Sequence, residues 1–262
     1  MDKKMRLKFI IWNYVAFLVS ILLAGVILLT LGKNNPMLQK LVVIPCSWAP
    51  TFVVMVGIKK WKLGVTRKEL IKSLFKQKVR VSRLIPIVIA QVLILVVSIA
   101  IIAINKTHAS RLVMTSTTAI IISFINSVLT GATGEEICWR GILHPEMVNN
   151  YGIIKGSIWL GVIWGFWHAP LWFLTSGYQG IDLIKYIVCF LVFIIAMAVI
   201  IGISYEKNRN LLVPMILHFT VNFSLSFYME DILDIIFYIA ILYTALAVID
   251  VYIYTRKRIV RN

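Results

Sequence analysis

The chain has 262 residues, of which 60% are hydrophobic, and it carries a formal net charge of +16. Soluble domains are closer to half apolar, so this composition excludes an ordinary soluble protein and predicts a single integral membrane domain over residues 1–262. In a soluble chain the charge would indicate a nucleic-acid partner. In a membrane protein the cations of cytoplasmic loops explain it, and we expect no nucleic acid as partner.

Apolar stretches of about 20 residues, the length that crosses the hydrocarbon core of a bilayer, recur along the chain. They predict an all-α bundle with about eight transmembrane helices. The first stretch is too long for the apolar region of a signal peptide and lacks a cleavage pattern, so it is expected to be an anchor. The predicted spans are residues 9–31, 38–58, 84–104, 112–134, 153–175, 183–204, 211–229 and 232–254.

Lysine and arginine predict the orientation of these spans, because cytoplasmic loops are rich in both. With the N-terminus inside, most of the 27 such residues fall in inside segments. We therefore expect both termini in the cytoplasm and membrane lipids as partners. The composition, rich in lysine and isoleucine, is typical of a low-GC bacterium, which predicts the bacterial cytoplasmic membrane. The outside segments hold Lys33, Lys40, Lys106, Arg111 and Lys185.

The segment 59–83 is the most basic of the inside segments. Apolar residues recur in it at helical spacing between lysines, which predicts a helix lying in the interface against anionic lipid. A simple topology anchor explains the charges equally well, and both interpretations stay open. The apolar positions are Leu70, Ile71, Leu74, Phe75 and Val79.

Ionisable residues inside membrane spans indicate function, because burying them is costly. The stretch GATGEEICWRG, residues 131–141, holds two carboxylates and an arginine. Glu136 and Arg140 are one helical turn apart and are expected to pair. Glu135 points about 100° away from Glu136 and is left to face something else, which suits a general base. The alternative is an ordinary ion pair at a helix end that has no role in catalysis.

Two further spans carry polar residues. His168 lies in WGFWHAP, where Pro170 is expected to interrupt the helix and the Gly161–Gly165 pair to admit a close neighbour. His218 and Asn222 are four residues apart, so they share one face of their helix. Taken separately, each cluster is explained by hydrogen bonding between helices.

Together, one carboxylate, two histidines and an amide on three helices provide a base, a proton carrier and hydrogen-bond donors for an oxyanion. Amide hydrolysis needs those parts. We expect no role for His108 and His144, which fall in predicted loops, nor for a Cys138 nucleophile, because its side chain points away from that of Glu135. The three cysteines, Cys46, Cys138 and Cys189, are odd in number and lack metal-binding spacing, so no disulfide framework is predicted.

The three motifs resemble those of the CPBP family, named for CAAX proteases and bacteriocin-processing proteins, which includes the type II CAAX prenyl endopeptidases. GEEICWRG matches the EExxxR motif. Trp164 to His168 matches FxxxH with tryptophan for phenylalanine, which we expect to alter only a packing position. His218 to Asn222 matches HxxxN. The motifs span residues 134–223, about a third of the chain, and the family also has eight spans.

The resemblance implies an intramembrane endopeptidase acting on lipidated proteins or on membrane-bound peptides such as bacteriocin or pheromone precursors. Glu135 and His168 would activate a water molecule, and His218 and Asn222 would stabilise the oxyanion. Glu136 and Arg140 would orient the catalytic side chains without contacting the substrate.

The sequence leaves open whether the activity depends on a metal ion. No HExxH motif is present, and a metal-free site without cofactor is the preferred interpretation. A zinc-dependent version would use Glu135, His168 and His218 as ligands.

Two other functions compete with proteolysis. A bacteriocin-immunity or regulatory binding protein would keep the fold, although a scaffold has no need to bury all four polar side chains. A small-solute transporter would also explain deep polar residues, but no inverted repeat is visible.

One difficulty concerns depth. If the fourth span ends at residue 134, Glu135 lies near the inner surface while His168 lies much deeper.

Overall fold

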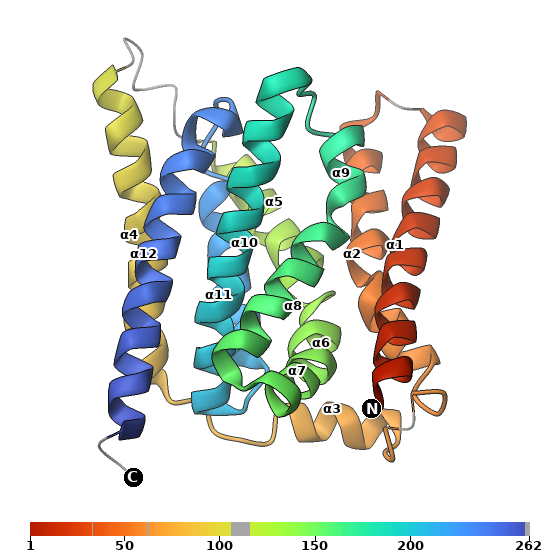
Figure 1. Cartoon of the computed structure of the whole chain (residues 1–262). Coiled ribbons are helices and arrows are strands. Elements are labelled where there is room, and N and C mark those ends of the chain that lie inside the picture. Colours follow the sequence, from red (N-terminus) through yellow and green to blue (C-terminus); the bar gives the residue numbers. More distant parts are fainter. Residues whose placement is uncertain (33, 62, 106–115, 260–262) are drawn as a thin grey trace.

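The computed structural model describes residues 1–32, 34–61, 63–105 and 116–259, and within them the chain is a bundle of helices (Figure 1). The predicted start of the fourth span, residues 112–115, and His108 lie outside this part of the chain. The elements are α1 Lys3–Leu31, α2 Pro36–Val56, α3 Arg67–Leu74, α4 Val81–Asn105, α5 Thr117–Ser127, η2 Val128–Ala132, α6 Glu136–Cys138, η3 Trp139–Leu143, α7 His144–Tyr151, α8 Ile153–Trp167, α9 Ala169–Leu174, α10 Gly180–Asn208, α11 Leu212–Leu225 and α12 Ile232–Ile259.

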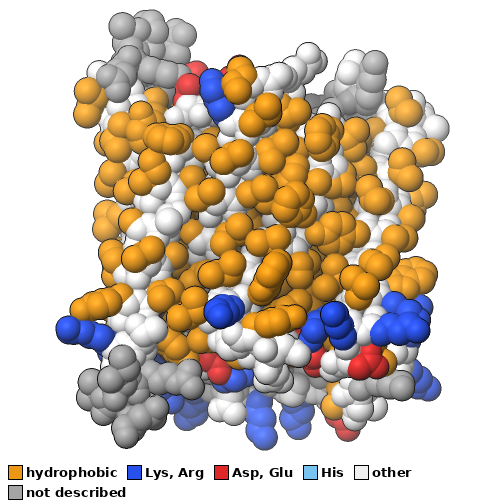
Figure 2. Space-filling view, viewed as in Figure 1, with side chains coloured by type: hydrophobic (Ala, Val, Ile, Leu, Met, Phe, Trp, Pro, Cys, Tyr) orange, Lys and Arg blue, Asp and Glu red, His pale blue; other side chains and the backbone are white. Residues whose placement is uncertain are grey.

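The prediction of an all-α membrane bundle is confirmed. Within the described residues, six helical stretches are long and apolar enough to cross a bilayer, and two shorter apolar helices, Leu41–Val56 and Leu212–Leu225, coincide with predicted spans. Large apolar side chains cover the outside of the bundle, among them Leu22 and Leu29 at 68% and 77% exposure (Figure 2). Such a surface is unfavourable in water and suits contact with lipid tails. The count of eight spans and the sidedness stay predictions.

The fourth span does not end at residue 134. The chain continues in helical turns from Thr117 to Tyr151, broken at Thr130 and Gly131. Gly131 has φ 56°, ψ −79°, in the left-handed half of conformational space that favours glycine. The break redirects the chain, so that the acidic motif begins a new helical segment inside the bundle.

This continuation removes the difficulty of depth. Glu135 precedes Tyr151 by about 24 Å of helix, and His168 follows the start of α8 by about 22 Å, at 1.5 Å per residue. Because α7 and α8 meet at Gly152, both side chains reach the same level of the bundle. The prediction that the fourth span ends at residue 134 was wrong, because the polar motif that follows was interpreted as lying at the membrane surface.

The helix α8 is held close to α10 by small residues. A Cβ on Gly161 would lie 2.8 Å from the Cα of Ile195, so only glycine permits this approach. The helix ends at Trp167, and α9 begins after His168 with Pro170 in its first turn. The predicted interruption is therefore present, and it leaves His168 at the break.

The basic segment contains the predicted helix, α3, which crosses the end of the bundle where α1 begins (Figure 1). Thr66 and Glu69 cap its start reciprocally, and the backbone N–H of Thr66 lowers the pKa of the Glu69 carboxyl. Leu70 and Leu74 are buried against the protein, and the Leu74 carbonyl accepts a 2.8 Å hydrogen bond from the backbone N–H of Leu211. These two leucines therefore close the end of the bundle and are not presented to lipid.

Candidate active site

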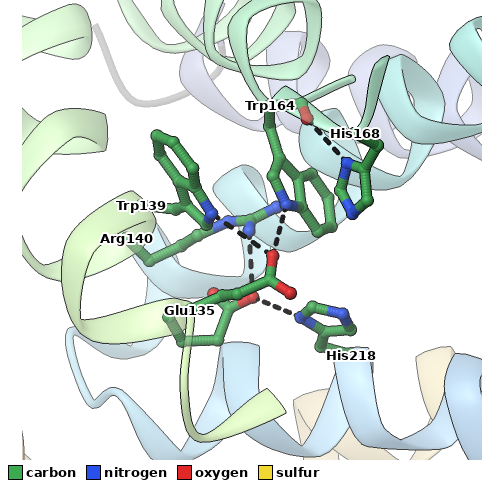
Figure 3. A network of polar contacts seen from close by, with 7 residues as sticks. Glu135, Trp139, Arg140, Trp164, His168 and His218 are labelled. Carbon is green, nitrogen blue, oxygen red and sulfur yellow. Dashed lines mark hydrogen bonds and ion pairs between the residues drawn. The ribbon is translucent and has the colours of Figure 1, made fainter. Parts of the chain in front are cut away.

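Glu135 is buried, with 4% of its surface exposed, at the start of α6. Its Oε2 accepts hydrogen bonds from the indole nitrogens of Trp164 at 2.6 Å and Trp139 at 3.3 Å (Figure 3). Two N–H donors on one oxygen hold the carboxylate in a single orientation. Since both bonds fall on Oε2, the carboxylate keeps acceptor capacity on Oε1 for another partner.

Glu136 and Arg140 form the ion pair that their spacing predicts, with Arg140 Nη1 2.9 Å from Glu136 Oε1 and both side chains at 0% exposure. The same oxygen accepts a 2.7 Å hydrogen bond from His218 Nδ1. The Arg140 guanidinium also lies over the Trp164 ring, 4.2 Å from its centroid. Glu136 therefore connects two helices and sets the orientation of the His218 ring.

His168 has a defined tautomer. Its Nδ1 lies 2.8 Å from the Trp164 carbonyl oxygen, which only accepts hydrogen bonds, so Nδ1 carries a proton. In the neutral ring Nε2 is then unprotonated and available to accept a proton. Trp167 packs edge-on against the ring at 4.9 Å and restricts its rotation. This is the arrangement that a general base requires.

His218 and Asn222 meet beside Gly131. A Cβ on Gly131 would lie 2.7 Å from Asn222 Nδ2 and 2.8 Å from His218 Nε2. Both nitrogens thus converge on the backbone break that precedes the acidic motif. Asn222 Nδ2 is suited to donate a hydrogen bond to an oxyanion, and His218 Nε2 can donate only in a ring that carries two protons, because Nδ1 already donates to Glu136.

A cavity of about 700 Å³ joins these groups. Glu135, His168, His218 and Asn222 all line it, whereas Glu136 and Arg140 do not. The structure thus brings the four predicted catalytic residues together around one cavity. The predicted supporting residues, Glu136 and Arg140, lie outside the cavity. The remaining wall is largely apolar, with Phe17, Val42, Leu171, Phe190 and Met197 among its side chains.

Zinc dependence through Glu135, His168 and His218 stays a prediction. Across the described part of the chain, no three His, Cys, Asp or Glu side chains are grouped closely enough to hold a metal ion. A catalytic zinc needs three such ligands. We therefore derive no step through a metal.

Two tryptophans were not predicted to belong to the site. Trp164 was expected to matter only for packing, and this is wrong, because its N–H donates to Glu135. Phenylalanine, which the family motif carries, has no such donor. Trp139 donates to the same oxygen. A buried indole N–H usually needs an acceptor, and two tryptophans beside an acidic motif were the available signal.

Two excluded residues lie outside the cavity. His144 is not in a loop: it begins α7, is buried, and its Nε2 lies 3.1 Å from Ser157 Oγ. The Cys138 thiol is fully buried and donates to Asn13 Oδ1 at 3.2 Å. Neither residue lines the cavity, so neither is placed to attack a substrate in it.

Trp164→Phe should lower activity about tenfold, because a hydrogen bond to a charged group contributes about 1.5 kcal/mol or more. The substitution keeps an aromatic ring beside Arg140 and removes the N–H donor. Turnover of a cleaved peptide measures the effect. Trp159→Phe, an exposed position on the same helix, is the matched control. Equal activity of the two variants would contradict a role for the indole N–H.

The chain is similar in sequence to known prenyl endopeptidases. Residues 116–224 match the model of the Rce1-like type II CAAX prenyl endopeptidases. The chain is also 30% identical over 192 residues, 70% of each chain, to the CAAX prenyl protease 2 of Methanococcus maripaludis. The matched region contains all six predicted site residues.

Proposed function

Because the chain belongs to the Rce1-like family of type II CAAX prenyl endopeptidases, we propose that it is an intramembrane endopeptidase of the bacterial cytoplasmic membrane. It hydrolyses peptide bonds of membrane-associated or lipidated proteins and peptides. The observation that carries the proposal is the shared cavity of Glu135, His168, His218 and Asn222. A binding scaffold has no need to direct four polar side chains into one apolar cavity.

In the proposed reaction a water molecule lies between the Glu135 carboxylate and His168 Nε2. The carboxylate accepts one proton of the water as the water oxygen attacks the scissile carbonyl carbon, and His168 Nε2 accepts a hydrogen bond from the same water. Asn222 Nδ2, and His218 Nε2 in the protonated ring, donate to the oxyanion that forms. As the carbon–nitrogen bond breaks, the proton passes to the leaving amine. Glu136 and Arg140 hold His218 and do not contact the substrate.

The test is cleavage by the purified protein in lipid vesicles, with membrane-bound peptides as substrates and products identified by mass. We expect two new termini for each cut, and full activity in the presence of a zinc chelator. Loss of activity on chelation, restored by added zinc, would replace the metal-free mechanism with a zinc-dependent one. Absence of cleavage from a broad set of peptides would contradict the protease.

Asn222→Ala should lower turnover about 100-fold with little change in KM, because removing one oxyanion donor costs about 10²–10³ in kcat. The matched control is Asn150→Ala, which removes an exposed amide near the end of α7. Kinetics with a single reporter peptide separate kcat from KM. A rise in KM with unchanged kcat would contradict the oxyanion role and indicate substrate binding.

A further inference from the structure

A second large cavity, of about 940 Å³, lies between the ends of three long helices. Its lining comes from the first turns of α4 and from the last turns of α10 and α12. The helix α12 packs against both α10 and α4, and all three reach the end of the bundle that α3 crosses (Figure 1). The residues that line this cavity include none of the predicted catalytic four. The second cavity is therefore separate from the candidate active site, and its volume is usual for a ligand pocket.

Positive charge predominates in the second cavity. Four cationic side chains line it, against one carboxylate, that of Asp250. This carboxylate is paired with Lys207, whose Nζ lies 2.9 Å from Asp250 Oδ1. The other three cations are exposed, and they are Arg83, Arg256 and Lys257. Because an excess of three positive charges surrounds one hollow, the second cavity attracts anions.

Arg83 connects two walls of the second cavity. It lies in the first turn of α4, and its Nη1 donates a 3.4 Å hydrogen bond to the Lys207 carbonyl oxygen near the end of α10. A guanidinium has five N–H donors in a planar fork, so this bond leaves donors for a ligand. Such a fork matches two oxygens of a phosphate group.

The interior of the second cavity is polar. Ser204 and Asn208 of α10 are both buried. The Asn208 amide has partners, because it donates to the Ser204 carbonyl oxygen and accepts from the backbone N–H of Arg80. Among the described residues, Ser204 Oγ and Asp250 Oδ2 have no hydrogen-bond partner. Buried polar groups usually have one. A headgroup with a phosphate and hydroxyl groups carries an acceptor for the serine and a donor for the carboxylate.

The second cavity lies where the basic end of the bundle meets its apolar surface. Figure 2 shows lysine and arginine side chains gathered at this end and hydrophobic side chains covering the bundle beyond it. Both kinds contribute to the cavity, since Leu84 and Ile87 of α4 and Ile253 of α12 line it together with the cations. Cationic and tyrosine side chains favour the membrane interface, and Tyr254 is also part of the lining. A ligand with an anionic head and apolar chains contacts both surfaces.

We propose that the second cavity binds an anionic phospholipid, whose phosphate lies among Arg83, Lys207 and Arg256 and whose acyl chains follow the apolar wall of α4 and α12. Basic pockets between transmembrane helices are suited to such headgroups. A free phosphate would use the cations and leave the apolar wall without a partner. This proposal does not depend on the proposed protease function, and its tests measure lipid binding alone.

Binding is measured on the purified full chain in a neutral detergent by native mass spectrometry. Phosphatidylglycerol is the anionic probe, and phosphatidylcholine with the same acyl chains is its control without net charge. The chain should bind phosphatidylglycerol at least about tenfold more tightly, because each cation near the membrane surface contributes about fivefold to the binding of anionic lipid. Equal affinity for the two lipids would overturn the proposal.

Charge variants locate the binding. Arg83→Gln combined with Arg256→Gln removes two exposed cations of the second cavity and should lower the affinity for phosphatidylglycerol about 25-fold. The matched control, Lys68→Gln combined with Lys72→Gln, removes two exposed cations of α3 at the same end of the bundle. It should bind as the native chain does. Equal losses in the two double variants would show a general attraction to the basic end and would overturn the site.

Ser204→Ala tests the place of the headgroup. It removes the hydroxyl that has no partner within the described chain, so the unfolding temperature in detergent alone should not fall. The affinity for phosphatidylglycerol should fall severalfold. Unchanged affinity would overturn the contact between the headgroup and Ser204.

A soluble competitor distinguishes a lipid from a free phosphate. Glycerol phosphate, which has the phosphate but no acyl chains, is added in excess to the chain with bound phosphatidylglycerol. Sodium chloride at the same ionic strength is the control. The lipid should stay bound equally in both. Displacement by glycerol phosphate beyond that by the salt would identify a site for soluble phosphates and overturn the lipid assignment.

Discussion

Replacement of Glu135 by glutamine should abolish peptide cleavage and leave the protein folded. Glutamine has nearly the same shape, and its side-chain oxygen can still accept from Trp164 and Trp139. The amide cannot take a proton from water, however. Loss of a positioned general base lowers the rate by up to about 10⁴-fold. The expected result is therefore a folded protein with negligible turnover.

The measurement compares membrane peptides from cells that produce the native chain or the Glu135→Gln variant at matched levels. Glu230→Gln, an exposed carboxylate before α12, is the control and should behave as the native chain. Cleavage products should appear with the native chain and the control only. Identical peptides in all three, together with a Glu135→Ala protein that still confers protection against a bacteriocin, would favour the immunity role.

Replacement of Glu136 by glutamine should produce the largest loss of stability. Arg140 would keep its charge at 0% exposure without a carboxylate partner. Breaking a buried ion pair from one side costs about 3–5 kcal/mol, because the remaining charge is uncompensated. The change also replaces the charged acceptor of His218 Nδ1 by a neutral one. We expect a lower unfolding temperature and lower activity together.

Thermal unfolding in detergent measures this effect. Glu146→Gln is the matched control, because its ion pair with the N-terminal amine is partly exposed and should contribute about 1 kcal/mol or less. The double variant Glu136→Gln with Arg140→Met removes both charges and should be more stable than Glu136→Gln alone. An unchanged unfolding temperature for Glu136→Gln would show that the ion pair does not hold the site together.

Local features of the site followed from the sequence. The pairing of Glu136 with Arg140 depends only on helical spacing, as does the shared face of His218 and Asn222. The membrane bundle followed from the length of the apolar stretches, and the helix break at His168 from Pro170. These features depend on residues within about one helical turn or on the average polarity of a segment. Such local properties can be read directly from the sequence.

Only the tertiary structure decided how the motifs meet. The left-handed turn at Gly131 carries Glu135 to the level of His168, and the indole N–H of Trp164 finds its acceptor 29 residues away. The helix α3 closes one end of the bundle. These features depend on contacts between helices that are distant in sequence. The apolar spans are alike in composition, and lipid tails solvate any apolar helix face equally well. The sequence of a span therefore does not show how deep it lies or which face it turns toward its neighbours. The packing of particular side chains between helices determines both.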